Sequence, residues 1–446
     1  MFELLDTVLE MAAGERLGGA EAYAERSVSR RIKVFGGAVE QLTAARRAGI
    51  GLRVFRDGAV GYAHTSETSA AALADLVRRA VDLVAVTDAD EHAVLPAPAG
   101  PAAAVNVYDP MLSVATDEQR IGLAVAAERA ALDHDRRVTL VEDTIYADAD
   151  AEVFLASSAG VRGSYRAGHC YLFVYALAEE DGRTETGISY ALGRDPARLD
   201  PALCGGEAAE RACRLLGAAP CPSMKATVVL DPFVTAAVLG VLGAALTADA
   251  VQKGRSLFAT RQGQAVAASV VDLSDDGVHP DGLASAPFDG EGVPSRRTPL
   301  IGGGVLQGFL YDTYTGHKAG VASTGNGLRG SYQNAPSVRP TNLVLGGPAT
   351  PAADIVAGVE RGVLVTDAVG VHSGANPVSG EFSVGISGVL IESGRLSRPL
   401  REVTLAGDIL SMLAGVVAVG DDARWVPSGS ALAPTVAIEG MSIGGA

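Results

Sequence analysis

Aromatic residues and cysteines are both scarce in this chain. Phe, Trp and Tyr make up 5% of its 446 residues, so aliphatic side chains must supply most of any core. The four cysteines are Cys170, Cys204, Cys213 and Cys221, and none forms a CxxC pair. This spacing argues against a disulfide framework and against a cysteine zinc site. It favours reduced thiols, and we therefore expect a cytoplasmic protein.

Basic residues are outnumbered by acidic ones. The chain carries 36 Lys and Arg against 52 Asp and Glu, a formal net charge of −16. Because binding to phosphates requires a basic face, this balance argues against nucleic acid as a direct partner. Long apolar runs are missing as well. The longest, Ala236–Leu246, is too short to span a bilayer, and Met1–Asp6 lacks the basic start of a signal peptide, so we expect no membrane association.

Histidines in a metal-binding spacing are absent too. Two His four residues apart on a helix project from one face and can share a metal ion. The seven histidines here are scattered, and no two have this spacing. They are His64, His92, His134, His169, His279, His317 and His372. The sequence therefore shows no metal site.

The chain does contain enough apolar residues for large cores, 48% of the total, and 54 glycines that imply many tight turns. A chain of this length is expected to form two to three domains. Two Pro-containing stretches, Val94–Ala104 and Gly217–Ser223, are candidate linkers. We therefore expect an N-terminal α+β domain at 1–93, a central α+β domain at 105–218 and a β-rich C-terminal domain at 223–446.

The first two expected domains follow one plan. Alternating apolar and polar residues predict strands at Ala22–Val28, Arg31–Phe35, Ala38–Ala44 and Gly49–Phe55, with a helix before and after the strands. The central range repeats the order of helix, strands, acidic glycine turn, strand and helix, which suggests a duplication although the residues barely match. We expect an α+β fold, with an N-terminal α/β region of mixed strands and helices followed by a strand-rich, barrel- or sandwich-like C-terminal domain.

The stretch Asp231–Ala250, DPFVTAAVLGVLGAALTADA, predicts a central helix of the C-terminal domain. Asp231 can cap the first N–H groups, and Pro232 suits the first helical position. The residues up to Thr247 are almost all Ala, Val, Leu and Gly, so we expect the helix to be apolar on every side and buried. It holds no His, Cys or acid between Asp231 and Asp249.

Two short motifs invite an enzymatic interpretation. Gly325–Gly330 matches GxGxxG, but a dinucleotide site needs a preceding strand, a following helix and an acid about 20 residues further on, and the sequence supplies none of them. Asp289 and Glu291, in FDGEGVP, can act as an acid–base pair or can hold a turn between strands. We favour a loop for the first motif and a turn for the second.

A polar segment near residue 380 brings His and Ser together in the sequence. It contains His372, Ser373, Ser379 and Ser383, with Phe382 among them. A Ser nucleophile needs a base, an orienting acid and an oxyanion hole, and a GxSxG motif is absent here. We favour a polar loop that shapes a groove or a subunit interface.

Six segments of the C-terminal half carry further information through their order and spacing. They are Gly254–Phe258, Ala267–Ser269, Asp275–Gly277, Asp289–Pro294, Ser323–Arg329 and Asn376–Ser383. This set resembles the TldD/PmbA family, once called modulators of DNA gyrase and better described as a two-subunit zinc protease system. The resemblance runs from Arg30–Gly36 to Ile438–Ile443, which is nearly the whole chain.

The resemblance implies a zinc motif, HExxxH, on the helix after Asp231 in the catalytic, TldD-type subunit. The matching positions here hold Leu239, Gly240 and Ala244, and no Cys follows Cys221 to match that subunit's third ligand. Zinc catalysis requires three protein ligands and an open position. The chain therefore resembles the PmbA (TldE) branch, which implies no metal or cofactor in this chain and zinc in a catalytic partner.

Three functions stay open from the sequence. The chain can be a non-catalytic subunit that pairs with a TldD-like zinc protease and helps to enclose unfolded peptides, a self-sufficient hydrolase, or a peptide-binding homodimer. Whether it is itself an enzyme is open. Under the first hypothesis, the loops Gly325–Arg329 and His372–Ser383 are expected to lie near each other and to face the partner or the substrate. Their candidate residues are Asn326, Arg329, His372, Ser373, Ser379, Phe382 and Ser383.

Overall fold

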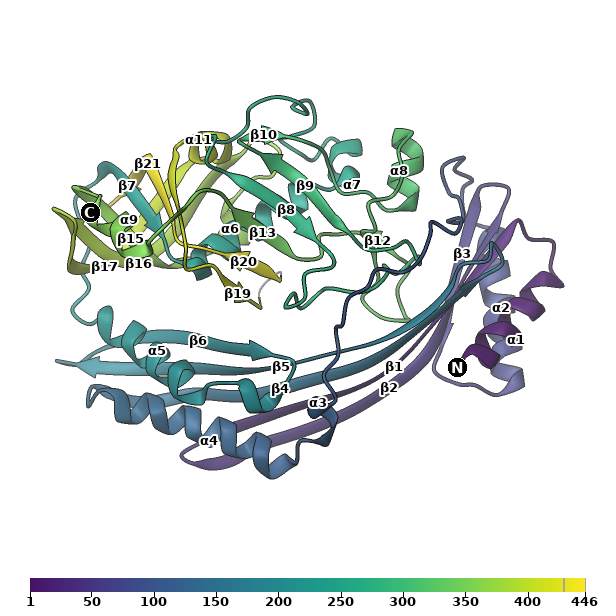
Figure 1. Cartoon of the computed structure of the whole chain (residues 1–446), viewed down its shortest axis with the longest axis horizontal. Coiled ribbons are helices and arrows are strands. Elements are labelled where there is room, and N and C mark those ends of the chain that lie inside the picture. The colour runs from purple at the N-terminus through teal and green to yellow at the C-terminus, as the bar shows by residue number, and fades with distance from the viewer. Residues whose placement is uncertain (428–429, 446) are drawn as a thin grey trace.

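The computed structural model describes residues 1–427 and 430–445 and leaves out the side chain of His372. Its N-terminal half forms one antiparallel sheet of six strands. The strands are β1 (Gly19–Phe35), β2 (Ala38–Arg56), β3 (Ala59–Thr65), β4 (Val138–Ser157), β5 (Arg162–Glu180) and β6 (Arg183–Gly193). Their order across the sheet is β3-β2-β1-β4-β5-β6 (Figure 1). The ranges 1–93 and 105–218 therefore share a single sheet, joined where β1 pairs with β4.

Helices cover one face of this sheet, and the C-terminal half covers the other. Even-numbered residues of β1 pack under α1 (Phe2–Ala13) at one end and under α4 (Asp117–His134) at the other. The helix α2 (Ala70–Val84) covers β2 and β3, and α5 (Pro201–Arg214) covers β5 and β6. Tyr23 and Leu155 point to the opposite face, where they contact Phe288 and Tyr332. Figure 1 shows the sheet curving around the C-terminal domain. A short helix, α3 (Met111–Val114), and a 3₁₀ turn, Pro196–Arg198, complete this half.

Local capping signals explain where several helices begin. The Ser69 side chain accepts a hydrogen bond from the N–H of Ala72 at the start of α2. Thr116 and Gln119 form a reciprocal capping box at the start of α4. Such caps satisfy N–H groups that a helix leaves unpaired at its first turn. None of the described helices is both long and apolar enough to cross a bilayer.

The N-terminal half repeats one plan, as the sequence suggested. The order of elements is helix, long hairpin, third strand and helix in both α1-β1-β2-β3-α2 and α4-β4-β5-β6-α5. The first strand of each repeat lies at the centre of the sheet, and the third strand lies at an edge. The two repeats are therefore related by an approximate two-fold arrangement about the β1–β4 pair.

The strands of this sheet are longer than the sequence predicted. The alternation of apolar and polar residues breaks near Ser29 and again near Arg46, yet β1 and β2 continue through both points without interruption. Ion pairs across the sheet compensate for the polar residues. Arg26 Nε donates to Glu152 at 2.7 Å, and Arg30 lies 3.0 Å from Asp148, both across the β1–β4 pair. Such cross-strand pairs stabilise a strand without leaving a local pattern in the sequence.

The C-terminal half contains a closed barrel, which confirms the expected α+β fold with a barrel-like second part. Its five strands are β7 (Met224–Leu230), β15 (Arg361–Val369), β16 (Glu381–Glu392), β17 (Arg395–Asp408) and β21 (Val436–Gly444), and β21 closes the ring by pairing with both β17 and β7. β18 (Val416–Gly420) and β14 (Ala349–Thr350) extend the sheet beyond β21.

A second sheet and several short elements surround the barrel. The sheet consists of β8 (Asp272–Asp276), β9 (Arg297–Gly302), β10 (Val305–Leu306), β13 (Leu343–Gly346), β19 (Arg424–Val426) and β20 (Ala431–Ala433). β11 (Gly327–Leu328) pairs only with β12 (Ser337–Val338) among the described strands. The helices are α6 (Pro232–Ala245), α7 (Ala248–Gln252), α8 (Thr313–Ala319), α9 (Ala352–Ala357), α10 (Val371–Gly374) and α11 (Ile409–Ala414).

Helix α6 lies between the barrel and the second sheet. It contacts β7 and β15 on one side and β13, β19 and β20 on the other. The helix is not buried on every side as the sequence predicted. Leu239 and Leu242 are buried, whereas Ala237 and Gly240 are partly exposed and Ala244 is exposed. An apolar stripe of α6 therefore remains open, because neither sheet reaches this face of the helix.

Candidate functional site

The first turn of α6 is anchored to the N-terminal half through α5. The Asp231 side chain accepts a hydrogen bond from the N–H of Phe233, which is the cap that the sequence predicted. Arg211 of α5 lies 2.8 Å from the Asp231 carboxylate and also donates to the Thr366 carbonyl oxygen at 2.7 Å. The same guanidinium stacks 4.5 Å from the centre of the Phe233 ring. These contacts fix the direction of α6 relative to the sheet.

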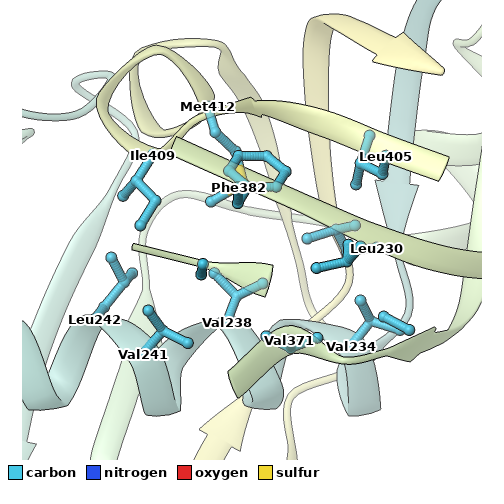
Figure 2. A pocket seen from close by; sticks show the side chains of 13 residues that line it. Leu230, Val234, Val238, Val241, Leu242, Val371, Phe382, Leu405, Ile409 and Met412 are labelled. Atoms are coloured by element: carbon cyan, nitrogen blue, oxygen red, sulfur yellow. The ribbon is translucent and has the colours of Figure 1, made fainter. Parts of the chain in front are cut away.

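An apolar cavity of about 40 Å³ adjoins α6. Figure 2 shows Val234, Val238, Val241 and Leu242 on the helix, with side chains from the barrel and α11 across the cavity. Its lining residues are Leu230, Val234, Val238, Val241, Leu242, Ala368, Val371, Ala375, Phe382, Val384, Leu405, Ile409 and Met412. A space of this size can hold one water molecule, but a water needs two or more polar partners. The lining offers none, so the cavity is expected to stay dry.

The positions that correspond to the zinc motif do not fit a zinc ion. Leu239, Gly240 and Ala244 carry no side-chain nitrogen, oxygen or sulfur, and the Met412 thioether is the only such heteroatom in the cavity lining. Zinc in proteins is held by Cys, His and carboxylate ligands, with three of them at a catalytic site. The described residues also contain no cluster of three such side chains in metal-binding geometry. No zinc chemistry can therefore be assigned to α6 of this chain.

A larger cleft of about 370 Å³ lies between the sheet and the C-terminal domain. Its walls come from β5, β6 and α5 on one side and from α6, β15, β16 and β19 on the other. The main lining residues are Tyr175, Glu185, Thr186, Gly187, Ile188, Tyr190, Arg211, Phe233, Val234, Ala237, Thr366, Asp367, Ala368 and Ser387. Val234 and Ala368 also line the apolar cavity, so the two spaces adjoin.

Aromatic rings and arginines brace the walls of this cleft. Phe173, Tyr190 and Phe233 form a continuous stack, with centroid separations of 5.0 and 5.9 Å. Arg424 approaches the Phe233 ring to 4.8 Å, in addition to Arg211. Sequence reasoning missed the cleft, because its walls are far apart in the chain. The only local signal was a single aromatic residue, Phe233, in an otherwise aliphatic helix.

Asn326 and Arg329 are buried inside the molecule, unlike the expectation that they face a partner or substrate. Asn326 is 1% exposed, and its Nδ2 donates a hydrogen bond to Asp275 at 2.7 Å. Arg329 has a side chain that is 1% exposed and forms an ion pair with Glu21 of β1. Arg53 of β2 lies 2.8 Å from the same Glu21. The loop therefore joins the two halves of the chain through charges that are distant in sequence.

Asp289 and Glu291 take part in the same junction. The Asp289 carboxylate accepts hydrogen bonds from the N–H groups of Glu291, Val293 and Gly327, between 2.8 and 3.0 Å. Burial, and then the negative charge of Glu291, raise the pKa of Asp289 to about 8. Glu291 lies 3.1 Å from Arg53. Both carboxylates hold the turn and the junction, in agreement with the turn that we favoured over an acid–base pair.

The segment near residue 380 is divided between the core and the surface. Phe382 lines the apolar cavity at α6. Ser373, Ser379 and Ser383 are exposed, and the Ser379 hydroxyl accepts a hydrogen bond from the N–H of Glu381 at 3.3 Å. The side chain of His372 lies outside the described part of the structure.

The loops Gly325–Arg329 and His372–Ser383 adjoin different elements of the structure. The first contacts the N-terminal sheet, since Arg329 pairs with Glu21, and its partner strand β12 lies beside that sheet in Figure 1. The second continues into β16 of the barrel. None of the hydrogen bonds or ion pairs of the described residues joins the two loops, so their proximity stays a prediction. Long-range ion pairs, not shared polarity, decide where the first loop lies.

Comparisons with known proteins agree with the architecture over almost the full length. Residues 20–84 match the PmbA/TldA metallopeptidase domain 1, residues 112–216 match the central domain, and residues 223–445 match the C-terminal domain. This chain belongs to the PmbA/TldD family. It is 28% identical to the metalloprotease PmbA of Escherichia coli O157:H7, with 98% of this chain and 96% of that protein covered.

Members of both branches of the family are among its relatives. The metalloprotease TldD homolog of Haemophilus influenzae is also 28% identical, over 89% of this chain and 86% of that one. The crystal structure of TldE from Thermococcus kodakarensis has the same fold, with a TM-score of 0.91, 22% identity and coverage of 99% and 100% of the two chains. Overall sequence identity to these relatives therefore does not decide between the PmbA and TldD branches. The presence or absence of zinc-ligand atoms on α6 is the more informative feature.

Proposed function

We propose that this chain is the non-catalytic, TldE-like subunit of a zinc metalloprotease that processes unfolded peptides together with a TldD-like subunit. The observation that carries the proposal is the composition of α6. Leu239, Gly240 and Ala244 stand where the catalytic subunit is expected to hold HExxxH, and they supply no donor atom. Zinc, as the group that activates the attacking water, is therefore assigned to the partner.

The open face of α6 supports a role at a shared site. Ala237, Gly240 and Ala244 form an apolar stripe that the chain itself leaves partly uncovered. Exposed apolar surface of this kind commonly marks a contact with another protein or a ligand. In the proposed complex, this chain shapes and encloses the peptide site but takes no part in bond cleavage.

A cytoplasmic location is part of the proposal. All four cysteines are free thiols, and Cys170, Cys204 and Cys221 are buried. Unpaired cysteines suit a reducing compartment. A peptide-binding homodimer remains the second candidate, because the cleft beside α6 belongs to this chain alone and does not require a zinc-bearing partner.

The test is co-expression of this chain with the TldD-like protein of the same organism. The purified complex, and each chain alone, are incubated with an unstructured peptide, with and without a chelator. We expect cleavage by the complex, loss of cleavage with the chelator and no cleavage by this chain alone. Failure of the two chains to associate, or chelator-resistant cleavage by this chain alone, contradicts the proposal.

A further inference from the structure

The cleft beside α6 follows the edge of a strand. Glu185, Thr186, Gly187 and Ile188 are successive residues of β6, and all four line the cleft. Thr186, Ile188 and Tyr190 share the face of β6 that lies toward the C-terminal domain, whereas Arg211 belongs to α5 on the other face of the sheet. Because both faces contribute to the lining, the cleft reaches around the edge of β6. β6 is the last strand of the six-stranded sheet, and β5 is the only described strand that pairs with it.

This edge offers unpaired backbone groups. From Glu185 to Tyr190 it extends for about 20 Å, at about 3.3 Å per residue. One carbonyl oxygen is occupied, since Arg424 donates to Tyr190 at 3.4 Å. Free strand edges attract further strands, and proteins usually blunt or cover them. Here the C-terminal domain lies opposite the edge (Figure 1). A space of about 370 Å³ remains between them.

The wall opposite the edge is apolar and carries one unbalanced negative charge. Phe233, Val234 and Ala237 of α6 form its apolar part. Two charged lining residues are neutralised, because Glu185 lies 2.9 Å from Arg401 and Arg211 lies 2.8 Å from Asp231. Asp367 is exposed and forms no ion pair with any described side chain. The net charge of the lining is therefore negative.

We infer that this cleft binds an extended peptide segment, which adds to the edge of β6 through its backbone and places apolar side chains against α6. Backbone pairing gives affinity with little dependence on sequence, as the capture of unfolded chains requires. Asp367 adds a preference for neutral or basic segments over acidic ones. The inference rests on the proposed function and extends it, since it makes this subunit itself a peptide-binding element.

The test measures binding, not cleavage. Unstructured, fluorescein-labelled peptides rich in Val and Ala, with either Lys or Glu at two fixed positions, are titrated with the purified chain and with the two-subunit complex, and fluorescence anisotropy is recorded. We expect the Lys peptide to bind a few-fold more tightly than the Glu peptide. Methylation of alternate backbone nitrogens in the Lys peptide removes donors needed for strand pairing, so we expect its affinity to fall at least about tenfold.

Two variants locate the site, each with a matched control. Ala237→Trp fills the cleft and should weaken binding of both peptides at least about tenfold, whereas Ala126→Trp on the exposed face of α4 should not. Asp367→Lys should reverse the preference between the Lys and Glu peptides, whereas Asp354→Lys on α9 should not. Circular dichroism confirms that each variant is folded.

Several outcomes overturn the inference. They are the absence of peptide binding by both the chain and the complex, wild-type binding by Ala237→Trp, and equal affinity for the methylated and unmethylated peptides. These results leave chelator-sensitive cleavage by the complex untouched, so they do not bear on the subunit assignment. Conversely, if the chain binds peptide in the cleft but does not associate with the TldD-like chain, the cleft is supported and the subunit assignment is contradicted.

Discussion

Replacing Arg329 by Met should destabilise the chain, because Arg329 holds its two halves together. Arg329 donates to the Gly290 carbonyl oxygen at 2.7 Å and to the Asn334 carbonyl oxygen at 3.0 Å, and it forms an ion pair with Glu21. Arg329→Met leaves the fully buried Glu21 carboxylate with Arg53 as its remaining partner. Removing one partner of a buried ion pair costs about 3–5 kcal/mol, and we expect a value near the lower end since Arg53 remains.

The assay is urea unfolding of the isolated chain, followed by circular dichroism. Arg129→Ala provides the control, since Arg129 and Asp133 form a pair with side chains that are 81% and 71% exposed. Its cost should stay below about 1 kcal/mol. The double variant Glu21→Gln/Arg329→Met should cost less than the sum of the two single changes, because each single change leaves a buried charge without its partner, whereas the double variant removes both charges of the pair.

One result would refute this reasoning. If Arg329→Met unfolds at the same urea concentration as wild type but lowers peptide cleavage by the two-subunit complex, then Arg329 acts on the partner or the substrate. The original expectation from the sequence would then be correct, and the buried pair with Glu21 would not describe the protein in solution.

Three further predictions follow from the structure. Metal analysis of the purified chain should find no stoichiometric zinc, and the triple variant Leu239→His/Gly240→Glu/Ala244→His should fold poorly instead of gaining activity, since Leu239→His places a polar ring in the buried core and no third ligand is present. Burial raises the pKa of Asp275 to about 6 and that of Asp289 to about 8, so the folded state favours the protonated acids. This contribution to the free energy of unfolding is complete below pH ~4 and is lost as the pH rises through the two folded-state pKa values. The urea concentration at the unfolding midpoint should therefore fall from pH ~5 to ~9, and it should fall less steeply with pH in Asp289→Asn. Gly61→Ala places a Cβ 1.9 Å from the Ala80 carbonyl oxygen and should lower the Tm by many degrees. By contrast, a Cβ at Gly122 in α4 meets no atom within 4 Å, so Gly122→Ala should raise the free energy of unfolding by about 0.5–1 kcal/mol.

The sequence predicted what depends on neighbouring residues. Asp231 and Pro232 mark the start of α6, because caps act over three or four residues. The repeat in the N-terminal half was visible because each copy carries its own alternation and glycine turn. The motif segments identified the family for the same reason.

Features that depend on distant residues escaped sequence reasoning. The polarity of Arg329 suggested an exposed loop, but its partner Glu21 lies 308 residues away and removes it from the surface. The all-apolar sequence of α6 suggested burial on every side, but the two flanking sheets leave the face around Ala244 open. The cleft at β6 follows from the order of strands in the sheet and from the docking of the barrel, and neither has a local signature.

The approximate two-fold order of the strands also has a consequence for the rate of folding. Within each repeat, the hairpins β1–β2 and β4–β5 join residues close in the chain, whereas the β1–β4 seam joins Glu21 to Ser157 and Val34 to Thr144. Contacts between distant residues require costly loop closure and form slowly. The two repeats are therefore expected to assemble first as separate hairpin units and to merge into one sheet afterwards. Until the seam closes, β1 and β4 each present an unpaired edge, and this interval is when the nascent chain is most prone to aggregate.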